Sequence, residues 1–340
     1  MTTNVGILEV AHYVPDRVLT NKELEQTLDT TDEWIRSRTG IEERRVASDT
    51  ETTATLATVA SRRVLEKAGL SAENLDLIIV ATMTPDSVLP AIACRVQAAL
   101  GAKNAGAFDV SIACSGYAYA LSMGCSYVKS GMARRVLVVG ADVMTRVMDW
   151  TQRGTCVLFG DGAGACIVGP VEEGFGLLAQ DLGADGSGAL HLQIPAGAGA
   201  KPHGSKGLTS QDFTLQMNGR EVFRFAVQAM GNAAVAAAEK AGITADEIDL
   251  FIPHQANNRI IEAAAKRLGV PTERVFVNVQ KYGNTSCASI PLALSEAVEQ
   301  NRIKPGDTLV LVGFGGGLAW GALVFKWGGF EEKISKMTAA

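Results

Sequence analysis

Charge is scarce in this 340-residue chain, and neither sign dominates. Only 20% of its residues are charged, and 31 Lys and Arg against 36 Asp and Glu leave a formal net charge of −5. The chain has no global basic field that would attract nucleic acid or an anionic membrane, so an acidic partner would have to meet a local basic patch. With 47% hydrophobic residues and 36 glycines, the composition excludes a disordered chain, a coiled coil and a collagen-like fibre.

Paired cysteines and export signals are also lacking. The six cysteines show no CxxC pair and no zinc-like spacing to a histidine, which favours reduced thiols and argues against a structural metal. The N-terminus has no basic segment followed by an apolar one, and Thr2 stands where myristoylation requires glycine. We therefore expect a cytoplasmic protein without a bound metal.

One uncharged stretch, residues 110–128, raises the question of a membrane span because its 19 residues approach the length that a bilayer requires. It contains four serines, two glycines and three tyrosines, and an apolar, strand-like FDV leads into it. We interpret it as the central, buried helix of a layered protein.

Strand-like and helical patterns alternate along the chain, which is typical of an α/β protein. The strand-like runs are 77–82, 107–110, 136–139, 250–252, 275–279 and 309–312. The helical patterns are 53–68, 114–130, 225–241 and 257–268. A glycine follows each helical pattern, and glycine readily adopts the left-handed conformation that ends a helix.

Two pairs of segments reveal an internal repeat. Residues 68–78 (AGLSAENLDLI) match 241–251 (AGITADEIDLF), and RVLVVG ending at Gly140 matches TLVLVG ending at Gly313. Both pairs are offset by 173 residues, which makes chance similarity unconvincing and predicts a duplicated βα unit.

The repeat divides the chain into an N-terminal half, residues 1–170, and a C-terminal half, residues 171–330. Residues 183–207, rich in Gly, Ala, Pro and Ser, are expected to form a mobile loop. A pseudo-twofold arrangement would bring strand ends from both halves to one cleft, which could draw residues from each.

Three residues are candidates for chemistry at that cleft. Cys114 opens the predicted buried helix, where the positive end of the helix dipole would lower the pKa of its thiol. His254 follows strand 250–252 and Asn284 follows strand 275–279, positions that line clefts in α/β proteins. Taken singly, each has a structural alternative: a small core cysteine, a packed histidine, a turn-forming asparagine.

Ordered motifs connect these residues to a known family. They are TDEWIRSRTGIEERR at 31–45, FDV at 108–110, CSG at 114–116, FGDGAGA at 159–165, PHQAN at 253–257, GNTS at 283–286 and GFGGG at 313–317. Each motif is weak alone, but the ordered set, spanning about residues 5–327, closely resembles β-ketoacyl-[acyl-carrier-protein] synthase III. That resemblance implies the thiolase-like α/β fold, whose duplicated halves form a five-layered αβαβα arrangement.

The resemblance also implies a two-step Claisen condensation that starts fatty acid synthesis. Cys114 would accept the acyl group of a starter acyl-CoA, with acetyl-CoA the leading candidate, and malonyl-[acyl-carrier-protein] would then lose CO₂ and attack the thioester. Neutral N–H donors on His254 and Asn284 would hold the enolate oxygen, while backbone N–H groups of Cys114 and Gly316 would hold the thioester oxygen. No cofactor is needed, and the family implies a homodimer.

Two binding surfaces are expected on the same basis. Trp34, Arg38 and Arg153 correspond to residues at the adenine and phosphate end of CoA, and Asn257 would lie along the pantetheine tunnel. A basic patch for the acidic carrier protein would use Arg224, Arg259, Lys266 and Arg267; Arg259 and Lys266, seven residues apart, share one helix side. The alternative for these charges is an ordinary solvated surface.

The chain departs from the family pattern in three places. Leu89 occupies the position where some members carry a phenylalanine that shortens the acyl pocket. Arg220 replaces a small polar residue found in some relatives. The tail, residues 331–340, runs past the usual end.

Rival functions are a type III polyketide synthase, a relative of thiolase or HMG-CoA synthase, and a catalytically silent subunit that binds carrier protein. Compact length and the basic patch disfavour the first, Asn284 disfavours the second, and the joint presence of Cys114, His254 and Asn284 disfavours the third. A dinucleotide cradle at GFGGG is disfavoured because the motif leads into the apolar LAWGALVF rather than into a helix.

Overall fold

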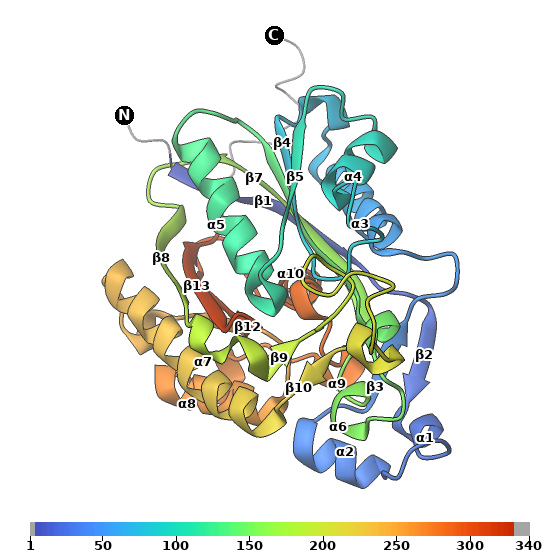
Figure 1. Ribbon diagram of the computed structural model, residues 1–340. Helices are drawn as coiled ribbons and strands as arrows, with labels where there is room; N and C mark the ends of the chain where they lie inside the picture. Colours follow the sequence, from blue (N-terminus) through green and yellow to red (C-terminus); the bar gives the residue numbers. More distant parts are fainter. Residues whose placement is uncertain (1–3, 330–340) are drawn as a thin grey trace.

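The computed structural model describes residues 4–329 as five stacked layers (Figure 1). Helices α3 (Thr53–Ala68) and α4 (Ile92–Leu100) form the first layer, and a five-stranded sheet forms the second. Helices α5 (Gly116–Lys129) and α10 (Ser289–Glu299) fill the middle. A four-stranded sheet and helices α7 (Gly219–Ala241) and α8 (Asn258–Leu268) complete the αβαβα arrangement, as the sequence predicts.

The first sheet has the strand order β1-β7-β6-β4-β5. Strand β4 pairs in parallel with β5 and β6, whereas β7 runs antiparallel to β6 and β1. The strands are β1 (Asn4–Tyr13), β4 (Leu77–Ala81), β5 (Gly106–Val110), β6 (Val136–Val143) and β7 (Asp161–Val171). Strands β4, β6 and β7 are buried along almost their whole length because helices cover both faces of the sheet there.

The second sheet repeats most of this pattern, with the order β11-β12-β13-β8. Its strands are β8 (Gly176–Ala184), β11 (Leu250–Pro253), β12 (Thr308–Gly315) and β13 (Ala319–Lys326). The parallel pair β11 and β12 corresponds to β4 and β6 of the first sheet at the 173-residue offset.

The predicted strand 275–279 is wrong. Val275 forms a single parallel bridge with Phe251, and Val279 already begins the short helix α9 (Val279–Tyr282). The side-chain Oε1 of Gln255 accepts the backbone N–H groups of Asn278 and Val279 at 2.9 and 3.2 Å. Those donors are therefore satisfied without a strand partner. Where β5 pairs with β4 in the first sheet, the second sheet has only the single bridge between Val275 and Phe251.

The helix predictions hold with shifted ends. Helix α3 spans the predicted residues 53–68, and α8 begins one residue after the predicted start. Helix α7 begins at Gly219 rather than residue 225, because the Asn218 side chain caps it by accepting the Glu221 N–H. Helix α5 lies buried between the sheets, as predicted for residues 110–128, and within residues 4–329 no helix combines the length and apolarity needed to cross a bilayer.

Short elements surround one end of the layers. They are β2 (Arg17–Thr20), α1 (Asn21–Leu24), α2 (Asp32–Thr39), β3 (Glu43–Val46), α6 (Arg153–Cys156), β9 (Leu192–Gln193) and β10 (Gln216–Met217). The predicted loop 183–207 starts in the end of β8 and includes β9, which pairs antiparallel with β10. The segment therefore supplies a wall next to the layers as well as irregular chain.

Glycines at the ends of repeated strands let the two halves interlock. A Cβ atom on Gly140 would lie 2.1 Å from the carbonyl oxygen of Cys287, so only glycine fits there. At its repeat counterpart Gly313, a Cβ would lie 3.4 Å from the carbonyl oxygen of Cys114. Each half thus presses the turn that precedes its central helix against a strand of the other half.

Candidate active site

Cys114 lies in the interlocked turn of the N-terminal half. It is the middle residue of a 3₁₀ turn, Ala113–Ser115, that leads directly into α5. Ala113 has a φ of +45°, an unusual conformation for a residue with a side chain, and its 173-residue counterpart Ser286 has a φ of +50°. The same strained turn therefore occurs in both halves, and in the first half it presents a cysteine.

A cavity of about 110 Å³ is lined in part by Cys114. His254 and Asn284 line the same cavity, so the structure brings together the three residues selected from the sequence. The remaining lining residues are mostly apolar: Leu158, Phe159, Leu192, Met217, Gly219, Val222, Phe223, Ala256, Asn257, Ile260, Phe314 and Gly315. The Cys114 side chain is nearly inaccessible, at 5% exposure, so a substrate must reach it through this channel.

His254 follows directly after β11 and is buried. Its Nδ1 hydrogen-bonds the hydroxyl of Ser289, and its ring stands edge-on to Phe314 at 5.4 Å between centroids. Burial lowers the pKa of His254 to about 3. The imidazole is consequently neutral at physiological pH and offers one N–H donor without a charge.

Asn284 is held by a backbone bond in each direction and by its own side chain. Its N–H donates to Leu158 O at 2.8 Å, and its carbonyl accepts from Gly160 N at 3.1 Å. Its Oδ1 accepts the N–H of Ser286 at 2.8 Å. Among the described residues, Nδ2 has no hydrogen-bond acceptor, so the amide keeps a free donor at the cavity.

The thiol of Cys114 differs from expectation in its acidity. Burial, together with a smaller effect of the negative charge of Asp142, raises the pKa of Cys114 to about 12. The hydrogen bond to the Ser286 hydroxyl, 3.4 Å from the sulfur, lowers the pKa but does not offset these effects. The prediction of a lowered pKa is wrong because removal from water outweighs the start of the helix. The resting residue is a protonated thiol.

Two guanidinium groups stand over the ring of Trp34. Arg38 and Arg153 each stand 5.1 Å from its ring centroid, and Arg153 also bonds the carbonyl and carboxylate of Asp29. The predicted trio is thus assembled, on α2 and α6. Asn257 connects it to the cavity: it caps α8 by accepting the Arg259 N–H, and its Nδ2 donates to Arg38 O at 3.0 Å.

The predicted basic residues lie on the adjacent helices α7 and α8, and all are exposed. Arg259 stacks over Phe223 at 5.5 Å, and Phe223 lines the cavity. Arg224 pairs with Glu221 at 2.6 Å, and Arg267 Nε donates to Asn232 at 3.1 Å. Within residues 4–329, Lys266 makes no ion pair.

Two family models match the chain: 3-oxoacyl-[acyl-carrier-protein] synthase III over residues 108–186, and the C-terminal part of the same enzyme over residues 238–327. A β-ketoacyl-[acyl-carrier-protein] synthase III of Caldanaerobacter subterraneus subsp. tengcongensis is 51% identical over 322 residues, 95% of this chain and 97% of the relative. The chain belongs to the β-ketoacyl-[acyl-carrier-protein] synthase III family.

Solved members of the synthase III family confirm the fold. The enzyme of Thermus thermophilus superimposes with a TM-score of 0.89 at 51% identity, covering 96% of this chain and all of that one. The enzyme of Aquifex aeolicus gives a TM-score of 0.88 at 47% identity over 95% of this chain and all of that one. The chain therefore has the thiolase-like α/β fold and is an acyltransferase that initiates fatty acid synthesis.

Some predicted site residues of this synthase III chain lie elsewhere. Leu89 is 82% exposed in the loop after β4 and is not among the residues lining the cavity of the single chain. Gly315 packs against Cys114, since its Cβ would lie 2.6 Å from Cys114 N, and Gly316 is the next residue, with a Cβ that would lie 3.5 Å from the Ala113 Cβ. Arg220 is exposed in the first turn of α7, and residues 331–340 lie outside the described residues.

Several site residues escaped the sequence analysis. Leu192 and Met217, from the paired strands β9 and β10, wall the cavity, but strands of two residues leave no periodic signal. Ser286 and Ser289 contact Cys114 and His254. The 173-residue offset could have found them, because it aligns the Cys114 turn with residues 286–288.

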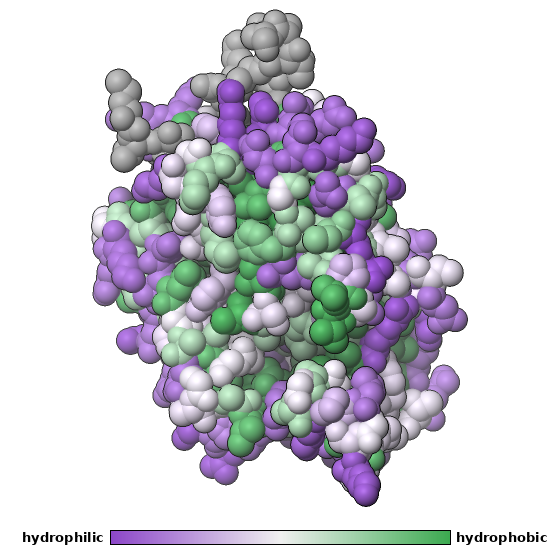
Figure 2. Space-filling model, turned by 45° about the horizontal axis from the view of Figure 1, so that its top comes forward, coloured by the Kyte–Doolittle hydropathy of each residue, from purple (hydrophilic) through white to green (hydrophobic). Residues whose placement is uncertain are grey.

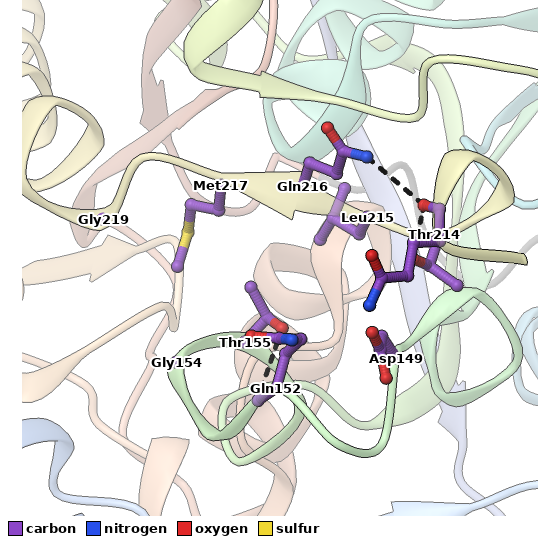
Figure 3. A pocket seen from close by; sticks show the side chains of 10 residues that line it. Asp149, Gln152, Gly154, Thr155, Thr214, Leu215, Gln216, Met217 and Gly219 are labelled. Atoms are coloured by element: carbon purple, nitrogen blue, oxygen red, sulfur yellow. Dashed lines mark hydrogen bonds between the residues drawn. The ribbon is translucent and has the colours of Figure 1, made fainter. Parts of the chain in front are cut away.

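A wider, polar pocket of about 350 Å³ adjoins the cavity and shares Met217 and Gly219 with it. Figure 3 shows Asp149, Gln152 and Thr155 facing Thr214 and Gln216 across this space. Its carboxylate, Asp149, is engaged by the Thr151 N–H and hydroxyl at 2.9 and 2.6 Å. None of the residues lining this pocket is a cysteine or a histidine, and the narrower cavity remains the candidate active site.

The protonation state of Cys114 has a measurable consequence. Because its pKa is raised to about 12, the thiolate fraction should rise about tenfold per pH unit from pH 7 to 9 without a plateau. Alkylation followed by peptide mass spectrometry measures this rate, with the exposed Cys94 as internal reference. A plateau near pH 7 would mean that the helix start does dominate.

Proposed function

We propose that the chain condenses acetyl-CoA with malonyl-[acyl-carrier-protein] through an acyl-Cys114 intermediate, using His254 and Asn284 as the oxyanion donors. The observation that carries this assignment is that one apolar cavity is lined by a thiol and two uncharged N–H donors. The free cysteines and the pathway favour a cytoplasmic location. The small cavity volume favours a short starter such as acetyl.

The first step stores the acyl group on Cys114. The sulfur attacks the thioester carbonyl, the carbonyl–sulfur bond to CoA breaks, and the thiol proton passes to the departing CoA sulfur. The adenine and phosphates of CoA would bind at Trp34, Arg38 and Arg153. Backbone N–H groups of Cys114 and Gly316 would stabilise the tetrahedral oxygen. Burial raises the pKa of the resting Cys114 thiol, so this step starts from the protonated form.

The second step needs donors that do not quench a carbanion. Loss of CO₂ from the malonyl thioester places negative charge on its carbonyl oxygen, which His254 and Asn284 would bind. A protonated histidine would be acidic enough to protonate the carbanion, and the low pKa of His254 prevents this. The carbanion then attacks the acyl-Cys114 carbonyl and expels the sulfur.

Replacing the donors should separate the two steps. His254→Ala and Asn284→Ala should still form the acetyl-enzyme but lose about 10²- to 10³-fold in decarboxylation of malonyl-carrier, because each removes one oxyanion donor. Release of labelled CO₂ and intact-protein mass measure the steps separately, with Cys114→Ala as the variant that should not acylate. Condensation at the parental rate in either donor variant contradicts the assignment.

A homodimer through the edge of the first sheet is part of the proposal. Strand β5 ends that sheet and leaves its outer backbone groups without a strand partner among the described residues. The neighbouring loop, between β4 and α4, exposes Val88 at 88% and Leu89 at 82%. Asp109 of β5 holds the end of this loop by accepting the N–H groups of Ile92 and Ala93. Figure 2 shows hydrophobic surface gathered within a hydrophilic rim on one face, as interaction surfaces require.

Dimerisation should depend on that loop. The parental chain should sediment at twice the mass of one chain, and Val88→Asp combined with Leu89→Asp should shift it toward a monomer, because two buried charges would lack partners. Met132→Asp is the control, since Met132 is 70% exposed before β6, at the opposite end of the parallel strands. A monomeric parental chain refutes the proposed dimer.

Carrier protein is proposed to dock on α7 and α8, with Arg224, Arg259, Lys266 and Arg267. Arg259 lies at the channel through its contact with Phe223, and Lys266 lies two helical turns further along the same side. An acidic partner would gain local attraction there despite the net charge of −5.

Charge reversal tests the docking surface. Lys266→Glu should raise KM for malonyl-carrier by about tenfold at low salt and leave acetylation by acetyl-CoA unchanged, because a rim charge acts mainly on association. Lys304→Glu, exposed before β12, controls for the change in net charge. If Lys266→Glu and Lys304→Glu raise KM for malonyl-carrier equally, or if Lys266→Glu leaves that KM unchanged, the carrier protein docks elsewhere.

A further inference from the structure

Ser289 is the residue behind His254. It is the first residue of α10, is 1% exposed, and its hydroxyl contacts Nδ1 of His254. Within the described part of the chain, its Oγ has no second side-chain or backbone partner. The hydroxyl hydrogen therefore has one acceptor available, the Nδ1 lone pair.

We propose that Ser289 is a positioning residue that donates its hydroxyl hydrogen to Nδ1 of His254 and thereby keeps the ring proton on Nε2, the nitrogen left for the cavity. This inference rests on the proposed role of His254 and concerns how that role is secured. A neutral imidazole carries one proton and one lone pair, and hydrogen bonding at one nitrogen determines the state of the other.

The alternative tautomer would oppose the reaction. With the proton on Nδ1, His254 would donate to Ser289 Oγ, and the Ser289 hydrogen would be buried without an acceptor among the described residues. The Nε2 lone pair would then face the oxygen that becomes negative during decarboxylation. Donation by Ser289 satisfies both buried groups and presents an N–H to that oxygen.

The internal repeat places an equivalent pair of positions in the N-terminal half. Ser289 lies 173 residues after Gly116, and His254 lies 173 residues after Ala81. Gly116 and Ala81 make the same contact between a helix start and a strand end, since a Cβ on Gly116 would lie 3.2 Å from the Cβ of Ala81. In the N-terminal half these two positions hold Gly116 and Ala81, which carry no polar side chain. In the C-terminal half they hold Ser289 and His254, which supply a hydroxyl and an imidazole.

The chain contains its own matched control. Ser295, also buried on α10, contacts Nδ1 of His12 at 2.9 Å, and neither residue lines the cavity. Ser295→Ala thus removes the same kind of serine–histidine bond from the same helix without touching the site. Because the chain has four histidines, nitrogen-15 labelling of histidine gives a spectrum in which each ring can be assigned by substitution.

The experiment compares the parental chain, Ser289→Ala, Ser289→Thr and Ser295→Ala. We expect Nε2–H at His254 in the parental chain. Ser289→Ala should populate Nδ1–H and lower the condensation rate on the order of tenfold while acetylation of Cys114 stays unchanged, because one buried hydrogen bond is lost. Ser289→Thr, which keeps a hydroxyl, should restore both readouts, and Ser295→Ala should alter neither.

Two results would overturn the inference. One is a parental His254 with its proton on Nδ1; the other is a Ser289→Ala variant whose tautomer and condensation rate are unchanged or whose rate falls no more than that of Ser295→Ala. The spectrum separates this question from the proposed function. A parental chain that never condenses would refute the function, while the position of the ring proton would still decide the role of Ser289.

Discussion

The structure depends on the close approach of two turns to two strands across the interface between its halves. The turn at residues 286–288 packs onto Gly140, where a Cβ would lie 2.1 Å from a carbonyl oxygen. Asp142, two residues further along β6, fixes that turn by accepting the Cys287 N–H at 2.9 Å. The reciprocal contact, between the Cys114 turn and Gly313, places the nucleophile against a strand of the other half. Without this interlock, Cys114 would not share a cavity with His254 and Asn284.

Burial follows from the interlock and sets the chemistry that the site can perform. A cavity lined mostly by apolar side chains from α7, α8, β12 and the β9–β10 pair cannot stabilise a free charge cheaply, so its groups rest neutral. The Cys114 thiol is protonated and His254 is unprotonated for the same physical reason. Neutral donors are what an enolate intermediate requires, and the buried carboxylate of Asp142 faces donors from Thr82, Met83 and Thr84 instead of the substrate.

Much of the layered fold could be predicted from the sequence, because the helix patterns ended at glycines and the 173-residue offset recurred in separate segments. The expected strand 275–279 failed because the Gln255 side chain occupies its backbone donors, a contact between distant residues that periodicity does not encode. The prediction of a lowered pKa for Cys114 failed for a similar reason. The position of Cys114 before a helix can be seen in the local sequence, whereas its burial, which raises the pKa, depends on the whole fold. Leu89 was expected at the acyl pocket from the family resemblance, but in the single chain its side chain is exposed and does not line the cavity.

The most direct test of the account is the intact mass of the chain after brief exposure to acyl-CoAs from acetyl to dodecanoyl, followed by malonyl-[acyl-carrier-protein]. We predict an acetyl adduct, mapped to Cys114, that disappears as 3-oxoacyl-carrier forms, with longer acyl groups adding more slowly. An adduct on another residue, or a Cys114 adduct that persists when malonyl-carrier is added, would contradict the account of a cavity that joins the nucleophile and its donors.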